Sequence, residues 1–254
     1  MTENGYVKVE INNSIATVEF FHSQSNSLPS NILAELANTI TEVSNNSNVK
    51  VIKLESAGNR AFCAGASFDE LISIQDFTSG KKFFMGFANV INAMRKSSKI
   101  TIVSVQGKAV GGGVGLISAA DYCLATKDSA VKLSELALGI GPFVVGPAVE
   151  RKIGKSAFAQ MSIDYDWYSA EWAFSKGLYN HIYDDFEKMK DSVNNLAIKL
   201  SNSSPKAMAE LKKVIWKGTE NWDELLSQRA EISGRLVLSD FTKNYIEEFK
   251  KKQK

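Results

Sequence analysis

Cysteine and histidine are scarce in this chain of 254 residues, which contains two of each. Cys63 and Cys123 cannot build a disulfide framework and lack the spacing of a metal site, so we expect reduced thiols with a packing role. His22 and His181 stand apart from any arrangement of serine or cysteine that would support nucleophilic catalysis. We therefore expect neither a metal centre nor a catalytic triad, and surface or structural roles for both histidines.

The chain also lacks an apolar run of the ~20 residues that a membrane span requires. Its first residues, MTENGYVKVEINNSIATVEF, have neither the basic nor the apolar region of a signal peptide. The 30 basic and 28 acidic side chains are interspersed and leave a formal net charge of +2. This balance offers no concentrated basic face for nucleic acid or an anionic membrane. We expect a cytoplasmic protein with no nucleic acid and no membrane as partner.

What is present is an alternation of strand and helix patterns along most of the chain. An alternating hydrophobic pattern on both sides of Asn12 and Asn13 predicts a β-hairpin. Pro29 opens a helical pattern with one apolar face. Further strands are expected at 49–56, 100–107, 122–126 and 131–139, and helices at 68–73 and 81–95. This order predicts an α/β fold.

Beyond about residue 190 the pattern changes to helices with no strand between them. They are expected at 187–200, 205–217, 221–237 and 240–252, and Pro205 suits the first turn of one of them. We predict a core domain over residues 1–195 and a helical C-terminal region over residues 196–254. The apolar faces of these helices suit burial against the same chain or against a neighbouring one.

Two segments rich in small residues follow predicted strands: FCAGAS at 62–67 and GGGVG at 111–115. Glycine lets the backbone approach a ligand closely, and the first amides of a helix point outward without an intrahelical acceptor. Taken singly, each segment suits a tight turn or an ordinary strand-to-helix connection. Taken together, they predict two backbone N–H groups that converge on one carbonyl oxygen, which is an oxyanion hole.

Glu135 lies in the otherwise apolar run LSELALGIGPF. A carboxylate among apolar neighbours tends to have a raised pKa, which suits proton transfer near neutral pH. The alternative is a solvent-facing glutamate at the end of a strand. The aromatic residues Phe83, Phe84 and Phe87 form a helix face that we assign to the core rather than to a ligand pocket.

Together these segments resemble the crotonase superfamily, also called the enoyl-CoA hydratase/isomerase family, over nearly the whole chain. AFCAGASFDEL resembles the first oxyanion-hole segment of the family, and VQGKAVGGGVGLISAADYCLAT resembles the second. SAEWAFSKGLYNHI and DFTKNYIEEFKKK resemble its later helix-and-turn and its closing helix. The resemblance implies Ala66 and Gly112 as oxyanion donors and Asp121 as a buried aspartate. The residues that it implies for binding of substrate or coenzyme A are Ala64, Gly65, Ala66, Ser67, Gly111, Gly112, Gly115 and Phe143.

Two departures from the family pattern bear on the reaction. Typical hydratases of the family carry two glutamates, but Gly115 stands at the first of these positions and only the second, Glu135, is present. The loop LGIGPFVVGPAVERKIG is closer to that of the Δ3,Δ2-enoyl-CoA isomerases, which also keep the later glutamate alone. The resemblance therefore implies isomerisation of an enoyl-CoA double bond, with Glu135 as proton shuttle.

Two alternatives stay open. One is an enoyl-CoA hydratase (a lyase) of fatty-acid or branched-chain acyl-CoA metabolism, in which a residue at another position orients the water. The other is a non-catalytic binding module. The resemblance further implies a spiral core of stacked ββα units, a helical C-terminal trimerisation region, a homotrimer or dimer of trimers, and no cofactor beyond the coenzyme A of the acyl-CoA substrate. The lysines that end the chain are expected to be solvated, with a CoA phosphate as a lesser alternative.

Overall fold

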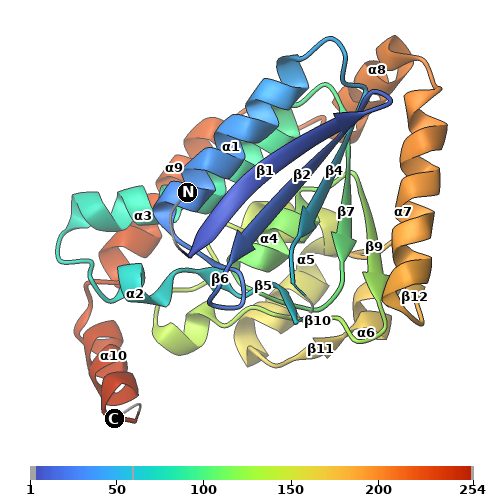
Figure 1. Cartoon of the computed structure of the whole chain (residues 1–254). Coiled ribbons are helices and arrows are strands. Elements are labelled where there is room, and N and C mark those ends of the chain that lie inside the picture. The colour runs from blue at the N-terminus through green and yellow to red at the C-terminus, as the bar shows by residue number, and fades with distance from the viewer. Residues whose placement is uncertain (1–3, 59, 253–254) are drawn as a thin grey trace.

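In the computed structural model, residues 4–58 and 60–252 are described, with side chains as far as residue 248 (Figure 1). The largest element is a six-stranded sheet in the order β1-β2-β4-β7-β9-β12. Its strands are β1 (Gly5–Asn12), β2 (Ile15–His22), β4 (Val51–Ser56), β7 (Ile100–Val105), β9 (Tyr122–Thr126) and β12 (His181–Tyr183). The first two form the predicted antiparallel hairpin, and the other pairs are parallel. The hairpin turns at Asn13 and Ser14, whose φ angles of 50° and 64° are left-handed.

A second sheet has four strands in the order β11-β10-β8-β5. They are β5 (Ala61–Cys63), β8 (Lys108–Val110), β10 (Ala130–Lys132) and β11 (Tyr168–Ser169), and a separate short pair joins β3 (Ser27–Leu28) to β6 (Gly65–Ala66). The strands β4, β7 and β9 of the large sheet are each followed by a strand of the second sheet, and then by helical structure. This repeat agrees with the spiral of ββα units that the resemblance implies.

The large sheet is covered on both faces, as expected for parallel strands. The helices α1 (Ser30–Asn45), α3 (Phe77–Lys96) and α4 (Gly112–Ser118) share one apolar core with one face of the sheet, and α7 (Phe186–Ser201) packs on the other (Figure 1). Neighbouring residues of a strand therefore enter opposite cores, as Ile102 and Val103 do. None of the described helices is long and apolar enough to cross a membrane.

One predicted strand is wrong over most of its length. The expected strand at 131–139 ends at Lys132, and Glu135–Leu138 form a 3-10 helix, η1. The strand ends because its partner β8 stops at Val110, where the chain turns into α4, so no parallel neighbour continues beyond Lys132. The left-handed Gly139, with φ of 76°, then ends η1.

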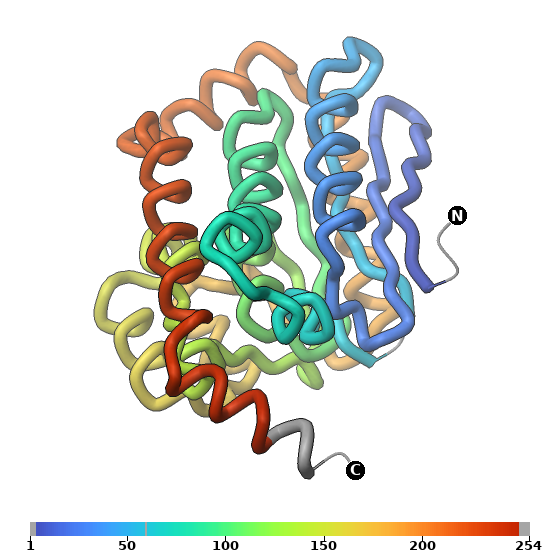
Figure 2. The backbone as a smooth tube through the Cα atoms, turned by 90° about the vertical axis from the view of Figure 1, so that its left-hand side faces the viewer, coloured from blue at the N-terminus to red at the C-terminus, as the bar shows by residue number. Residues whose placement is uncertain are grey.

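The four helices predicted for the end of the chain are present: α7, α8 (Pro205–Ile215), α9 (Trp222–Leu236) and α10 (Asp240–Lys252). α7 lies on one side of the large sheet, α9 and α10 lie on the other, and α8 runs between them (Figures 1 and 2). α9 packs against α3, and the Thr242 hydroxyl of α10 donates to the Leu138 carbonyl oxygen of η1 at 2.9 Å. The boundary at 195 falls within α7, so the division into two parts stays a prediction. The side chains of the terminal lysines lie outside the described residues.

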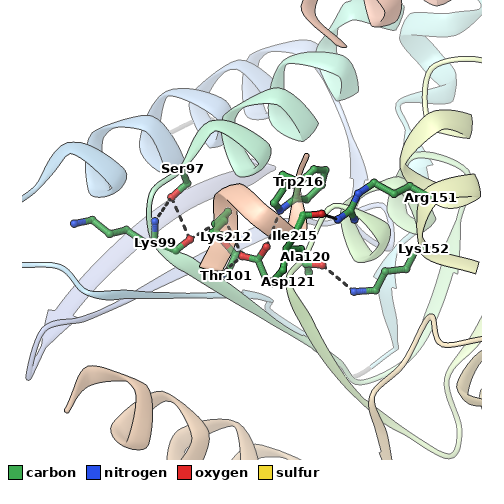
Figure 3. A network of polar contacts seen from close by, with 10 residues as sticks. All are labelled: Ser97, Lys99, Thr101, Ala120, Asp121, Arg151, Lys152, Lys212, Ile215 and Trp216. Carbon is green, nitrogen blue, oxygen red and sulfur yellow. Dashed lines mark hydrogen bonds and ion pairs between the residues drawn. The ribbon is translucent and has the colours of Figure 1, made fainter. Parts of the chain in front are cut away.

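A buried ion pair fastens α8 to the core (Figure 3). The Lys212 ammonium lies 2.8 Å from Oδ2 of Asp121, and both side chains are 3% exposed. The same ammonium donates to the Lys99 carbonyl oxygen at 2.7 Å, and Asp121 also accepts from the Thr101 amide and the Trp216 indole, each at 2.8 Å. Every charge in the pair thus has additional hydrogen bonds, which a buried pair needs to repay its desolvation.

Candidate active site

A cavity of about 340 Å³ lies where segments that are far apart in the sequence meet. Its walls come from the β6 junction, the β8-to-α4 junction, η1 with the turn that follows it, and α3. Most of the lining is apolar, with the rings of Phe83, Phe84 and Phe87 among it. These aromatic side chains, assigned from sequence to the core, therefore serve both as core and as cavity wall, because one helix face borders both.

The segment around β6 and the turn from β8 into α4 lie close together because Gly65 has no side chain. Gly65 has a left-handed φ of 93°, and a Cβ atom there would lie 3.1 Å from the Val110 carbonyl oxygen and 3.8 Å from the Gly112 amide nitrogen. On either side of Gly65 and Ala66, the amides of Ala64 and Ser67 donate to the backbone carbonyls of residues 26 and 28. Ala66 is thus presented at the cavity beside the start of α4.

Each glycine of the triple-glycine segment makes room for a different neighbour. A Cβ atom on Gly111 would lie 2.7 Å from Oε1 of Glu135, and one on Gly112 would lie 2.3 Å from the Phe87 ring. One on Gly113 would lie 2.5 Å from the carbonyl oxygen of the buried Cys63. Gly112 begins α4, so its N–H is one of the first-turn donors that lack an intrahelical acceptor.

Glu135 is the one ionisable side chain that lines this cavity in the described part of the chain. Its Oε2 atom is buried without a hydrogen-bond partner among the described residues. Burial raises the pKa of this carboxyl group to about 7, although hydrogen bonds from the backbone of residues 135 and 134 oppose the shift. A group that is half ionised near neutral pH is suited to both taking and returning a proton.

Gly115 lies beneath the cavity wall, not in it. A Cβ atom on Gly115 would lie 2.5 Å from Cγ1 of Val145, which itself lines the cavity and is 4% exposed. Ser67 is also outside the lining, because it is the N-cap of α2 (Phe68–Leu71) and its hydroxyl accepts from the Glu70 amide at 3.3 Å. The structure brings together the other expected site residues: Ala64, Gly65, Ala66, Gly111, Gly112, Glu135 and Phe143.

Two residues that shape the candidate site were not expected from the sequence. Val145 belongs to the loop at 140–147, whose sequence pattern singles out no neighbour of Gly115, because that contact depends on the path of the loop. Asn26 is 3% exposed and donates from Nδ2 to the carbonyl oxygens of Ala57 and Ala61, each at 3.0 Å, which ties β3 to the segment that leads into the first junction. A single asparagine in a polar stretch carries no sequence signal for such a role.

Comparisons with known proteins all point to one family. A family model described as enoyl-CoA hydratase/isomerase matches residues 10–254. A short-chain-enoyl-CoA hydratase of Clostridium acetobutylicum is 27% identical over 231 residues, which cover 90% of this chain and 88% of that protein. A peroxisomal Δ(3,5)-Δ(2,4)-dienoyl-CoA isomerase of Arabidopsis thaliana is 23% identical, with 94% and 93% covered.

Solved structures agree on the fold. The crystal structure of an enoyl-CoA hydratase from Bacillus halodurans superimposes with a TM-score of 0.88 at 22% identity, and covers 96% of this chain and 99% of that one. A crotonase described as a putative enoyl-CoA hydratase/isomerase, from Legionella pneumophila, gives a TM-score of 0.79 at 26% identity, with 98% and 97% covered. The expected crotonase-like fold is thereby confirmed.

Proposed function

The chain belongs to the enoyl-CoA hydratase/isomerase family, and we propose that it moves the double bond of an enoyl-CoA thioester from C3–C4 to C2–C3. In this proposal the amides of Ala66 and Gly112 hold the thioester oxygen. Glu135 takes a proton from C2, so that the C2–H bond breaks and a dienolate forms. The same carboxyl group then gives the proton to C4, and the electron pair returns to form the C2–C3 double bond. No cofactor is needed beyond the coenzyme A of the substrate.

The observation that carries this proposal is a single carboxyl group facing an apolar wall. Hydration of an enoyl thioester requires a group that holds and deprotonates water, and a second group that delivers a proton. Val145 fills the space beside Gly115, the position at which typical hydratases of the family carry their first glutamate. Proton transfer from C2 to C4 requires one base only. The negative charge on the thioester oxygen would be stabilised by the two amides, at about 3–4 kcal/mol for each donor.

Hydration is the second candidate, because some relatives carry that name. The protein of Clostridium acetobutylicum, named a short-chain-enoyl-CoA hydratase, is 27% identical over 90% of this chain. In that case Glu135 would act on water held by a group outside the usual position.

Purified protein incubated with 3-hexenoyl-CoA and, separately, with 2-hexenoyl-CoA distinguishes the two reactions. We expect 3-hexenoyl-CoA to be converted to the conjugated 2-enoyl thioester without a change of mass, followed by ultraviolet absorbance and mass spectrometry. We expect 2-hexenoyl-CoA to gain no water. A 3-hydroxyacyl product formed faster than the isomer would replace the leading proposal with hydration.

The pH dependence of kcat/KM for this isomerisation reports the ionisation of Glu135. The base must be deprotonated in the free enzyme, and burial raises its pKa to about 7. We therefore expect kcat/KM to be constant above about pH 8, to be half-maximal near pH 7, and to fall about tenfold for each pH unit below about pH 6. Initial rates at low substrate concentration across pH 5–9 measure this profile. A rate that stays level down to about pH 5 would show a base with an ordinary carboxyl pKa.

A further inference from the structure

A second cavity of about 330 Å³ lies behind the turn that closes the candidate active site. The two cavities share Gly141, Pro142 and Phe143 as lining residues. The far walls of the second cavity include Phe158, Ser162 and Ile163 of α5 (Gly146–Asp164). Neither the proposed proton transfer nor the oxyanion donors make use of this space.

The partition between the cavities is one turn thick. The amide of Phe143 donates to the Gly141 carbonyl oxygen at 2.9 Å, which closes the turn. Gly141 has a left-handed φ of 81°, and a Cβ atom there would lie 2.7 Å from the Phe143 ring. The ring therefore packs on bare backbone, and it borders both cavities. Phe143 is half-buried, so its side chain is the part of this partition that a change of torsion angle can move.

The lining of the second cavity suits a hydrocarbon chain. Most of its lining is apolar, and among the described residues only Ser162, Glu150 and Arg229 add polar side chains. The hydroxyl of Ser162 is already used, since it donates to the Phe158 carbonyl oxygen at 2.7 Å. Leu136 and Ile163 at its border are 45% and 69% exposed, so apolar surface there is left open to solvent. Its volume lies within the range of about 300–1,000 Å³ typical of ligand pockets.

The position of Glu135 indicates which part of a substrate would reach the second cavity. C2 and C4 of the acyl chain must lie at this carboxyl group, and the next residue, Leu136, already borders the second cavity. Carbons beyond C4 would therefore meet the Phe143 partition. We propose that the second cavity is the binding subsite for the distal hydrocarbon chain of a long acyl-CoA, with Phe143 as the side chain that admits it. This inference rests on the proposed function and adds the substrate class: long unbranched acyl chains.

The test compares a six-carbon with a twelve-carbon 3-enoyl-CoA. A methylene transferred from water into an apolar site strengthens binding about fourfold. We expect wild-type kcat/KM to be at least about tenfold higher for the longer substrate. Ser162→Trp, which fills the cavity from α5, is expected to lower the ratio of long-chain to short-chain kcat/KM about tenfold. Ser156→Trp is the matched control, because Ser156 is exposed on the same helix and lines neither cavity. It is expected to leave this ratio unchanged.

Phe143→Ala is the second variant, and it is expected to raise the same ratio by removing the partition. Equal ratios in wild type, Ser162→Trp and Ser156→Trp would overturn the inference while the activity on the short substrate upholds the proposed function. Absence of isomerisation at both chain lengths in wild type would overturn the proposed function itself. The alternative is that a second copy of the chain covers this cavity, and sedimentation of each variant tests it. A Ser162→Trp protein that loses subunits and loses activity on both substrates equally would assign this surface to a contact between copies of the chain.

Discussion

Glu135→Gln is expected to lower the kcat of isomerisation about a thousandfold. The glutamine side chain has nearly the same shape, but it cannot take a proton from C2 or return one to C4. General acid–base groups contribute about 10²–10⁴-fold to the rate. The measurement is single-turnover and steady-state conversion of 3-hexenoyl-CoA. Glu35→Gln, at an exposed glutamate of α1, serves as the control and is expected to match wild type.

The same substitution is expected to change how stability depends on pH. Burial raises the pKa of Glu135 from 4.5 to about 7, so between these values the folded protein binds more protons than the unfolded chain. The contribution of Glu135 to the free energy of unfolding of wild type therefore falls as pH rises from 4.5 to 7. Glutamine does not ionise. We expect the stability of Glu135→Gln relative to wild type to grow by about 3 kcal/mol across this range.

Urea unfolding at several pH values measures this stability difference, and any constant cost of burying the amide cancels from its slope against pH.

A variant that keeps wild-type turnover would show that another group is the base. A stability difference independent of pH would show that residue 135 is not buried as a carboxyl group.

Lys212→Met is expected to lower the free energy of unfolding by about 3–5 kcal/mol, because it leaves Asp121 charged, buried and without its cation. The effect arises from the pair shown in Figure 3, in which both side chains are 3% exposed. Lys213→Met is the matched control one residue further along α8. Lys213 pairs with Glu210 at 2.7 Å, but both side chains are 71% exposed, so the expected loss is within about 0.5 kcal/mol.

A double-mutant cycle with Asp121→Asn isolates the pair. Removing both charges relieves the unpaired carboxylate, so the double variant should lose less than the sum of the single variants, by about 2 kcal/mol. Urea unfolding followed by tryptophan fluorescence, at one protein concentration, gives each value. Losses that add within about 0.5 kcal/mol would contradict a coupled buried pair.

Much of the fold followed from local pattern. The hairpin, the strand at 122–126 and the helices after residue 186 are present within a few residues of their expected positions. Each depends on the spacing of apolar residues or on a local signal, such as Pro205 at the first position of α8 after the N-cap Ser204. Glu135 stood out for the same reason, as one carboxylate in an apolar run.

Features that depend on distant segments could not be predicted in this way. The strand expected at 131–139 ends early because its partner turns into α4 at Gly111. The cover over Gly115 comes from Val145, thirty residues away along the chain. Phe143 was expected at the substrate, but its second face on another cavity appears only when α5 is in place.

The sequence by itself determined the alternation of elements, the family, and the residue types available for chemistry, since apolar periodicity and glycine or proline act over a few neighbouring residues. Tertiary structure alone decided that the two glycine-rich segments come into contact, that the Glu135 carboxyl group lies beside Gly111, and that the cavity wall around this carboxyl group is apolar. The physical reason is that contacts between segments, and the loss of water that raises the pKa of Glu135, arise only when those segments pack together.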